Sequence, residues 1–264
     1  MLYPIQVGGH RAIRSAPTPD RVLKPLSQKE LAFYRRITAP DLHPHLHWLR
    51  KYTPAFYGTA TLPQSPSAIS DTPQPPEQFL ELEDLNFPFR NPSVLDVKLG
   101  FRHYDDDATP EKRLRQIQSA NSTTTAETGL VICGMRTFKS SVPETCSKHF
   151  GKTLKPHQLP DALYWFFHDG TSLQRTQMQQ VLSSLRALRS HFASQTSFFF
   201  YSSSLLIVYD SNPPASDVRM IDFAHTVPSE GHPDTGYLKA LDNLITVLET
   251  ALQLPHAPNL PSNE

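Results

Sequence analysis

The stretch NPSVLDVKLG, residues 91–100, places an acidic and a basic side chain two positions apart in an otherwise apolar segment. Its valines and leucines predict a buried β-strand. Side chains at positions i and i+2 of a strand point to the same face, so Asp96 and Lys98 are expected side by side. Burying charged groups is costly unless they have partners or a use. An acid that accepts a proton, beside a cation that holds an anion, suits transfer of a phosphoryl group onto a hydroxyl.

The composition is that of one large domain or two small lobes. The chain has 264 residues, of which 38% are apolar, so it can bury a sizeable core. Its 25 Lys and Arg balance its 25 Asp and Glu, which argues against a dedicated nucleic-acid binder. Two cysteines make no disulfide framework, so we expect an intracellular protein, cytoplasmic, nuclear or both. No apolar run predicts a membrane span, and no targeting signal is recognisable.

Periodicity and turn residues predict an α+β fold with two lobes and a cleft between them. Residues 1–85 are expected to form the smaller lobe, with a mobile Pro-rich loop at about 63–77, and residues 86–264 the larger one. Strands are predicted at 21–26, 55–60, 79–85, 94–99, 130–135, 198–209 (two runs) and 218–223. Helices are predicted at 28–38, 109–120, 156–168, 173–194 and 237–248.

Lys24 stands alone in an apolar predicted strand, and the helix that follows carries Glu30. Protein kinases align ATP phosphates with a strand lysine that is held by a helix glutamate. Ser27 and Glu30 also form a capping-box pattern, which competes for the glutamate. A lysine that extends to the surface is the alternative interpretation of Lys24.

Asp222 lies between Ile221 and Phe223 at the end of a predicted strand, where packing gives no reason for an acid. It resembles the Asp-Phe-Gly metal ligand of kinases, with Ala224 in place of the glycine. A carboxylate oxygen suits Mg²⁺, which bridges nucleotide phosphates. A turn-forming aspartate is the alternative.

The predicted helix at about 109–120 begins with Thr109 as N-cap and a proline in its first turn. Lys112, Arg115 and Gln116 follow at i, i+3 and i+4 and therefore share one face. With Lys98 they would line a pocket for several phosphates. A solvated helix face is the alternative, since three aspartates directly before the helix partly neutralise it.

Three segments together resemble the inositol polyphosphate kinase family. Residues 92–100 carry the pattern Pro-x-x-x-Asp-x-Lys-x-Gly, and the segments 203–206 (SSLL) and 221–225 (IDFAH) are similar to two later family motifs in the same order. Within the family the chain resembles most the multikinases of fungal type, in segments 108–113 and 150–160. Segments 201–206 and 233–237 also resemble hexakisphosphate kinases, so that alternative stays open.

The resemblance implies a protein-kinase-like fold that holds ATP and Mg²⁺ between the lobes. Lys24 would then bind ATP phosphates, and Asp96 would act near the ribose and the reacting hydroxyl, as a general base or as a positioning group. The hinge at the adenine would comprise Glu83, Asp84 and Leu85. The substrate would meet Lys98, Lys112, Arg115, Gln116 and His225. The metal would be held by Asp222, with help from Ser204.

The implied activity is phosphorylation of ring hydroxyls of inositol trisphosphate and tetrakisphosphate. A hexakisphosphate kinase that makes pyrophosphates and a non-catalytic inositol phosphate sensor are the alternatives, and a metal-binding acid argues against the sensor. The expected partners are inositol polyphosphates and phosphoinositide head groups, and no nucleic acid. The protein is expected to be a monomer. The connection at 210–217 is short where multikinases often carry a long insertion, which argues against nuclear import and scaffolding roles.

Overall fold

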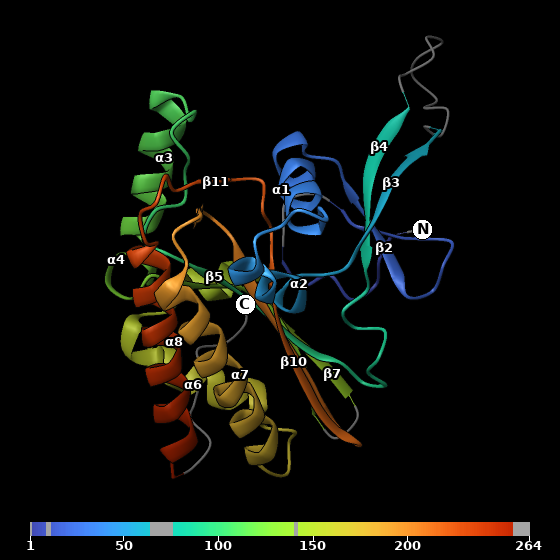
Figure 1. The fold of residues 1–264 in the computed structure, drawn as a ribbon. Coiled ribbons are helices and arrows are strands. Elements are labelled where there is room, and N and C mark those ends of the chain that lie inside the picture. Colours follow the sequence, from blue (N-terminus) through green and yellow to red (C-terminus); the bar gives the residue numbers. More distant parts are fainter. Residues whose placement is uncertain (1, 9–11, 64–75, 140–141, 256–264) are drawn as a thin grey trace, which may run out of the picture.

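The computed structural model describes residues 2–8, 12–63, 76–139 and 142–255. It contains a four-stranded and a five-stranded antiparallel sheet, each with its own helices, and Figure 1 shows the two sheets side by side. This mixed arrangement confirms the predicted kinase-like α+β fold. Most of the predicted mobile loop at about 63–77 lies outside the described residues.

The smaller sheet has the strand order β1-β2-β4-β3. Its strands are β1 (Arg14–Ser15), β2 (Arg21–Pro25), β3 (Phe56–Leu62) and β4 (Glu77–Glu83). Lys24 on β2 pairs with Leu80 on β4, in the middle of the sheet. The predicted strand at 79–85 therefore begins and ends two residues earlier than expected, and Asp84 and Leu85 follow its end.

Two helices accompany this sheet, α1 (Gln28–Thr38) and α2 (Trp48–Tyr52), with the short 3₁₀ helix η1 (Pro44–Leu46) between them. Helix α1 begins where predicted, but the Ser27 side chain makes no capping hydrogen bond. The predicted capping box is therefore wrong. Glu30 is buried and contacts Lys24 instead, because a charge-assisted hydrogen bond is stronger than one to a neutral backbone group.

The larger sheet has the order β10-β9-β5-β6-β7, which puts the opening motif on its central strand. Its strands are β5 (Ser93–Leu99), β6 (Leu130–Lys139), β7 (Val142–Cys146), β9 (Ser204–Ser211) and β10 (Pro214–Ile221). A separate two-stranded sheet joins β8 (Phe198–Phe200) to β11 (Thr226–Pro228). The short connection at 210–217 is part of the β9–β10 hairpin.

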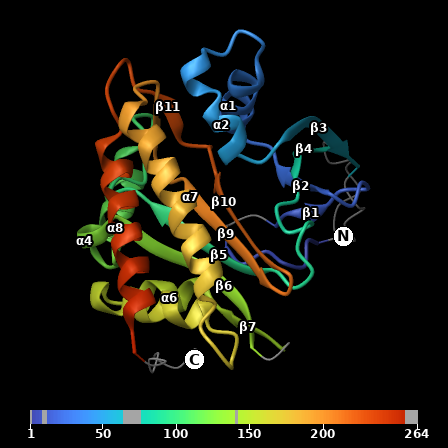
Figure 2. The same ribbon diagram turned by 60° about the horizontal axis from the view of Figure 1, so that its bottom comes forward.

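Long helices cover one face of the larger sheet, as Figure 2 shows. They are α6 (Leu159–Phe167), α7 (Arg175–Ser194) and α8 (Thr235–Gln253), and α5 (Lys148–Thr153) packs on β6. The buried face of α7 consists mainly of apolar side chains that recur at three- and four-residue spacing. The predicted helix at 156–168 is divided, because a 3₁₀ turn, η2 (Pro156–Gln158), precedes α6. Within the described ranges, no helix is both long and apolar enough to cross a membrane.

Helix α3 (Pro110–Asn121) projects from the body, beside the short helix α4 (Thr125–Thr128), as Figure 1 shows. Thr109 caps it as predicted, since its hydroxyl accepts a hydrogen bond from the backbone N–H of Lys112 at 3.3 Å. Ala120 is the only buried residue of this fully described helix. The helix is therefore held by its ends rather than by an apolar face.

Candidate active site

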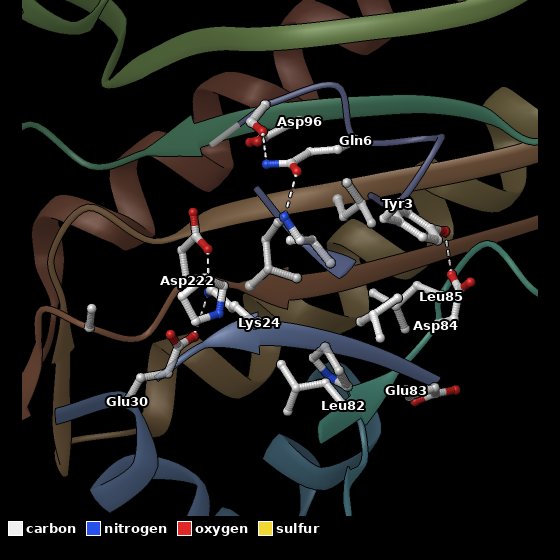
Figure 3. Close-up of a pocket in the computed structure, with 18 of the residues that line it drawn as sticks. Tyr3, Gln6, Lys24, Glu30, Leu82, Glu83, Asp84, Leu85, Asp96 and Asp222 are labelled. Carbon is white, nitrogen blue, oxygen red and sulfur yellow. Dashed lines mark hydrogen bonds and ion pairs between the residues drawn. The ribbon is translucent and has the colours of Figure 1, made fainter. Parts of the chain in front are cut away.

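A pocket of about 510 Å³ lies between the two sheets and takes its lining from both of them. This volume is within the range of small-molecule sites. One end has apolar walls from β2, β4, β5, β9 and β10, formed by Val22, Leu82, Val94, Leu206 and Ile221. Charged side chains gather at the other end, where Figure 3 shows Lys24 between two carboxylates.

Lys24 joins the two lobes at this polar end. Its Nζ donates to Glu30 Oε1 on α1 at 2.7 Å and to Asp222 Oδ1 beyond β10 at 2.5 Å. Burial alone would lower the pKa of Lys24, but the two carboxylates outweigh it and raise that pKa. The lysine therefore stays charged, which is what binding of an anion requires.

Asp222 takes a left-handed backbone conformation, with φ of 66°, directly after β10. This conformation is uncommon for residues other than glycine and aims the carboxylate into the pocket instead of along the strand. The next residue holds the turn in place. The Phe223 N–H donates to Glu30 Oε1 at 3.1 Å, and the Phe223 ring stacks on Phe33 of α1 at 4.2 Å.

Asp96 is buried on β5, with 4% of its surface exposed, and lines the same pocket. Burial raises the pKa of Asp96 to about 6, and the nearby Asp222 carboxylate adds to the shift. Its Oδ1 has no hydrogen-bond partner among the described residues. A β-bulge toward β6 lies between Asp96 and Val97, whereas the pairing with β9 stays regular.

These two carboxylates suit a divalent cation. They repel each other in the absence of one, and an unpartnered buried carboxylate oxygen is a hard ligand of the kind that Mg²⁺ takes. Within the described residues no group of three or more His, Cys, Asp and Glu could hold a metal by itself. A cation here would therefore depend on ligand phosphates and water for its other contacts, as Mg²⁺ commonly does.

Lys98 and Ser204 lie close to this carboxylate pair. Lys98 shares the pocket with Asp96, as expected from the i, i+2 spacing, and its Nζ donates to Ser202 Oγ at 2.9 Å. Ser204 on β9 is buried and does not line the pocket. No hydrogen bond reaches its hydroxyl in the described part of the chain, although it is near enough to favour the ionised form of Asp96.

The segment expected to be the hinge, Glu83 to Leu85, lines the apolar end of the pocket. The Glu83 carboxylate accepts from the backbone of Ala55 at 3.0 Å and from Arg219 of β10 at 3.3 Å. Asp84 turns the other way and accepts from the backbone N–H of Asn86 at 2.9 Å. The side chains thus shape the connection between the sheets, and its backbone borders the pocket.

Sequence reasoning noted a Gly-rich turn at Gly8 near a possible nucleotide roof, but it did not predict Tyr3 or the contacts of this segment. The Tyr3 hydroxyl donates to Asp84 Oδ1 at 2.5 Å, and both Tyr3 and Gly8 line the pocket. A Cβ added to Gly8 would lie 2.0 Å from Asp96 Oδ2, so only glycine fits against that carboxylate. No local pattern predicts these contacts, because they join residues more than 80 positions apart.

The residues predicted to meet the substrate are divided between two places. His225 lines the pocket, whereas Lys112, Arg115 and Gln116 lie on α3 and do not. Lys148 on α5 was not predicted for this role. Its pKa is lowered by burial and by the charges of Lys98 and Lys152, although Lys148 does not line the pocket.

Comparison with known proteins agrees with this geometry. Inositol polyphosphate kinase is the family that matches residues 79–249, and the chain belongs to this family. Inositol hexakisphosphate kinase 3 of Mus musculus is 37% identical over 199 residues, covering 65% of this chain and 50% of the relative. The Homo sapiens protein of that name is 35% identical over 208 residues, covering 65% and 51%. The chain thus spans about half the length of these curated relatives.

Solved structures share the fold. The inositol phosphate multikinase of S. cerevisiae, crystallised with ADP and Mn²⁺, matches with a TM-score of 0.73 at 24% identity, over 88% of this chain and 99% of that one. A second inositol phosphate multikinase structure matches with a TM-score of 0.69, also at 24% identity, over 83% and 98%. At this identity the likeness establishes the fold.

Proposed function

We propose that this chain is an ATP- and Mg²⁺-dependent kinase that phosphorylates ring hydroxyls of inositol polyphosphates. The observation that carries the proposal is the cluster of Lys24, Glu30 and Asp222 in one pocket with the buried Asp96. Kinases use a lysine, a helix glutamate and a metal-binding aspartate in this way around nucleotide phosphates. Family membership and the names of the relatives support the same activity.

The nucleotide is assigned to the space between the apolar walls and the polar end. Its base would lie between Val22 and Leu206, against the backbone at 83–85, with its phosphates at the Lys24 ammonium. Asp222 and Asp96 would hold a cation beside those phosphates. A bound divalent cation neutralises phosphate charge and thereby favours transfer.

The acceptor is assigned to the polar end and to the face of α3 that carries Lys112 and Arg115. Lys98 and His225 would contact it from the pocket, and Lys112, Arg115 and Gln116 from the helix. A substrate with several phosphates would give a use to cations both in the pocket and on α3 of a chain whose overall charge is balanced. Asp96 would hold the ribose or steer the reacting hydroxyl, so that positioning and charge stabilisation provide most of the catalysis.

The acceptors in this proposal are inositol trisphosphate and tetrakisphosphate. The similarity of segments 108–113 and 150–160 to multikinases supports this choice. A hexakisphosphate kinase is the second candidate, because the curated relatives at 32–37% identity carry that name.

A substrate panel tests both candidates. The protein is incubated with Mg-ATP and inositol phosphates that carry two to six phosphates, and product isomers are resolved by NMR. Turnover of trisphosphate and tetrakisphosphate is the expected result, whereas pyrophosphate products from hexakisphosphate alone would establish the second candidate. Ligand binding without ATP turnover would contradict both and indicate a sensor.

A further inference from the structure

A second polar network joins the lobes at the mouth of the pocket. Asp105, in the loop before α3, accepts hydrogen bonds at Oδ2 from Lys29 Nζ at 2.7 Å and from His225 Nδ1 at 2.9 Å. Lys29 belongs to α1 in the smaller lobe, and His225 follows β10 in the larger one. The Asp105 side chain is only 3% exposed, so one buried oxygen connects both lobes.

The carboxylate decides which nitrogen of His225 carries the proton. Although burial opposes it, the hydrogen bonds from His225 and Lys29 lower the pKa of Asp105 to about 2, so the acid stays ionised. An ionised carboxylate only accepts hydrogen bonds, so Nδ1 must be the protonated nitrogen. In the neutral ring Nε2 is then an acceptor, and it has no hydrogen-bond partner in the described ranges.

We propose that Asp105 is a positioning residue that fixes His225 with Nε2 as a hydrogen-bond acceptor for the reacting hydroxyl of the inositol phosphate. This inference rests on the proposed function, because it gives His225 an acceptor hydroxyl to orient. Lys29 ties the arrangement to α1, so closure of the lobes and orientation of the imidazole are linked. Carboxylates fix ring orientation in the same way behind histidines that bind metals.

Asp107 is the natural control for Asp105. It accepts from the same Lys29 Nζ, also at 2.7 Å, but its side chain is 79% exposed and does not contact His225. If Lys29 only needed a counter-charge, Asp107 would already supply one. The buried Asp105 therefore differs from its neighbour in one respect that bears on function, its contact with the imidazole.

The experiment compares the full chains of Asp105→Asn, Asp107→Asn and Lys29→Met with the wild type. Long-range ¹H–¹⁵N NMR reports the protonated ring nitrogen of His225, assigned with a His225→Ala variant, and steady-state kinetics separate kcat from KM. We expect Asp105→Asn to lose the pure Nδ1–H tautomer and to lower kcat roughly 10- to 100-fold, with little change in KM for ATP. Asp107→Asn should leave both unchanged.

Lys29→Met keeps the Asp105–His225 contact, so His225 should stay protonated at Nδ1 in this variant. The NMR measurement on Lys29→Met therefore tests the inference even if Asp105→Asn folds poorly. An unaltered tautomer in Asp105→Asn, or equal losses of kcat in Asp105→Asn and Asp107→Asn, would overturn the inference. A changed tautomer in Lys29→Met would overturn it as well. Failure of the proposed function itself looks different, since the wild type would then phosphorylate no inositol phosphate while the NMR comparison still reported on Asp105.

Discussion

The two ends of the proposed site are built in opposite ways. At the nucleotide end, Lys24 is ion-paired to both lobes and Asp96 is buried. At the acceptor end, α3 buries one residue and presents its charges to solvent. Breaking a buried ion pair costs about 3–5 kcal/mol, whereas exposed charges contribute about 0–1 kcal/mol to stability. Substitutions at the first end should therefore affect folding and catalysis together, and those on α3 only binding.

Asp222→Asn should have the largest effect, because a neutral amide holds a divalent cation much more weakly than a carboxylate and leaves Lys24 with the charge of Glu30 alone. We expect kcat with Mg-ATP to fall by roughly 100-fold or more. Asp217→Asn, on the strand β10 that precedes Asp222, is the control, since Asp217 pairs with Arg219 outside the pocket. Wild-type turnover in a folded Asp222→Asn protein would contradict the proposal that Asp222 holds the divalent cation.

Asp96→Asn should stabilise the metal-free protein at pH 7 by on the order of 3 kcal/mol, since burial raises the pKa of Asp96 from 3.8 to about 6. The folded-state pKa is the higher one, so the wild type gains stability as the pH falls from about 6 toward 4. The advantage of the variant should therefore shrink over this window and be absent below it.

Urea unfolding from pH 4 to 8 measures this difference. Asp106→Asn, at an exposed aspartate that pairs with Arg102, is the matched control and should show no such dependence. A stability difference between Asp96→Asn and the wild type that did not vary with pH would show that the buried acid carries no such cost.

Lys112→Ala and Arg115→Ala test the acceptor end. Each should raise KM for the inositol phosphate about 10-fold, the cost of one charge-assisted contact, and leave KM for ATP unchanged. Their melting temperatures should stay at the wild-type value, because neither side chain is buried. Leu114→Ala, at an exposed side chain on the opposite face of α3, is the control for helix effects. Equal changes in both KM values would remove α3 from the acceptor site.

Tyr3→Phe should have the smallest effect. It removes the hydrogen bond to Asp84 but keeps the ring beside the segment proposed to contact the base, so we expect KM for ATP to rise about threefold, with kcat unchanged. Tyr57→Phe, at an exposed tyrosine on β3, is the control. An ATP affinity like that of the wild type, measured by calorimetry, would show that this segment borders the pocket without shaping it.

Local patterns predicted most elements of the fold. The valines and leucines around Asp96 identified β5, and Thr109 followed by a proline identified the start of α3. The capping box at Ser27 was wrong for a physical reason, since Glu30 forms an ion pair with Lys24 that a local pattern cannot weigh against a cap. The predictions for α3 residues as substrate contacts stay predictions.

Contacts between distant segments could not be predicted. Tyr3 meets Asp84 across 81 positions, and His225 meets Asp105 across 120. No sequence pattern relates Tyr3 or His225 to a partner so far along the chain. From the sequence, Asp84 was predicted only as part of the hinge. Asp105 was noted only as one of three aspartates that partly neutralise a basic helix face.

The sequence by itself determined the elements and the side chains that carry the chemistry, because alternation, helix spacing and short motifs act over a few residues. The tertiary structure alone decided which charges face each other. Lys24 meets Asp222, Asp105 meets His225, and Asp96 is buried with its Oδ1 unpaired among the described residues. Electrostatic energies depend on distance and burial, and both arise only when the lobes come together.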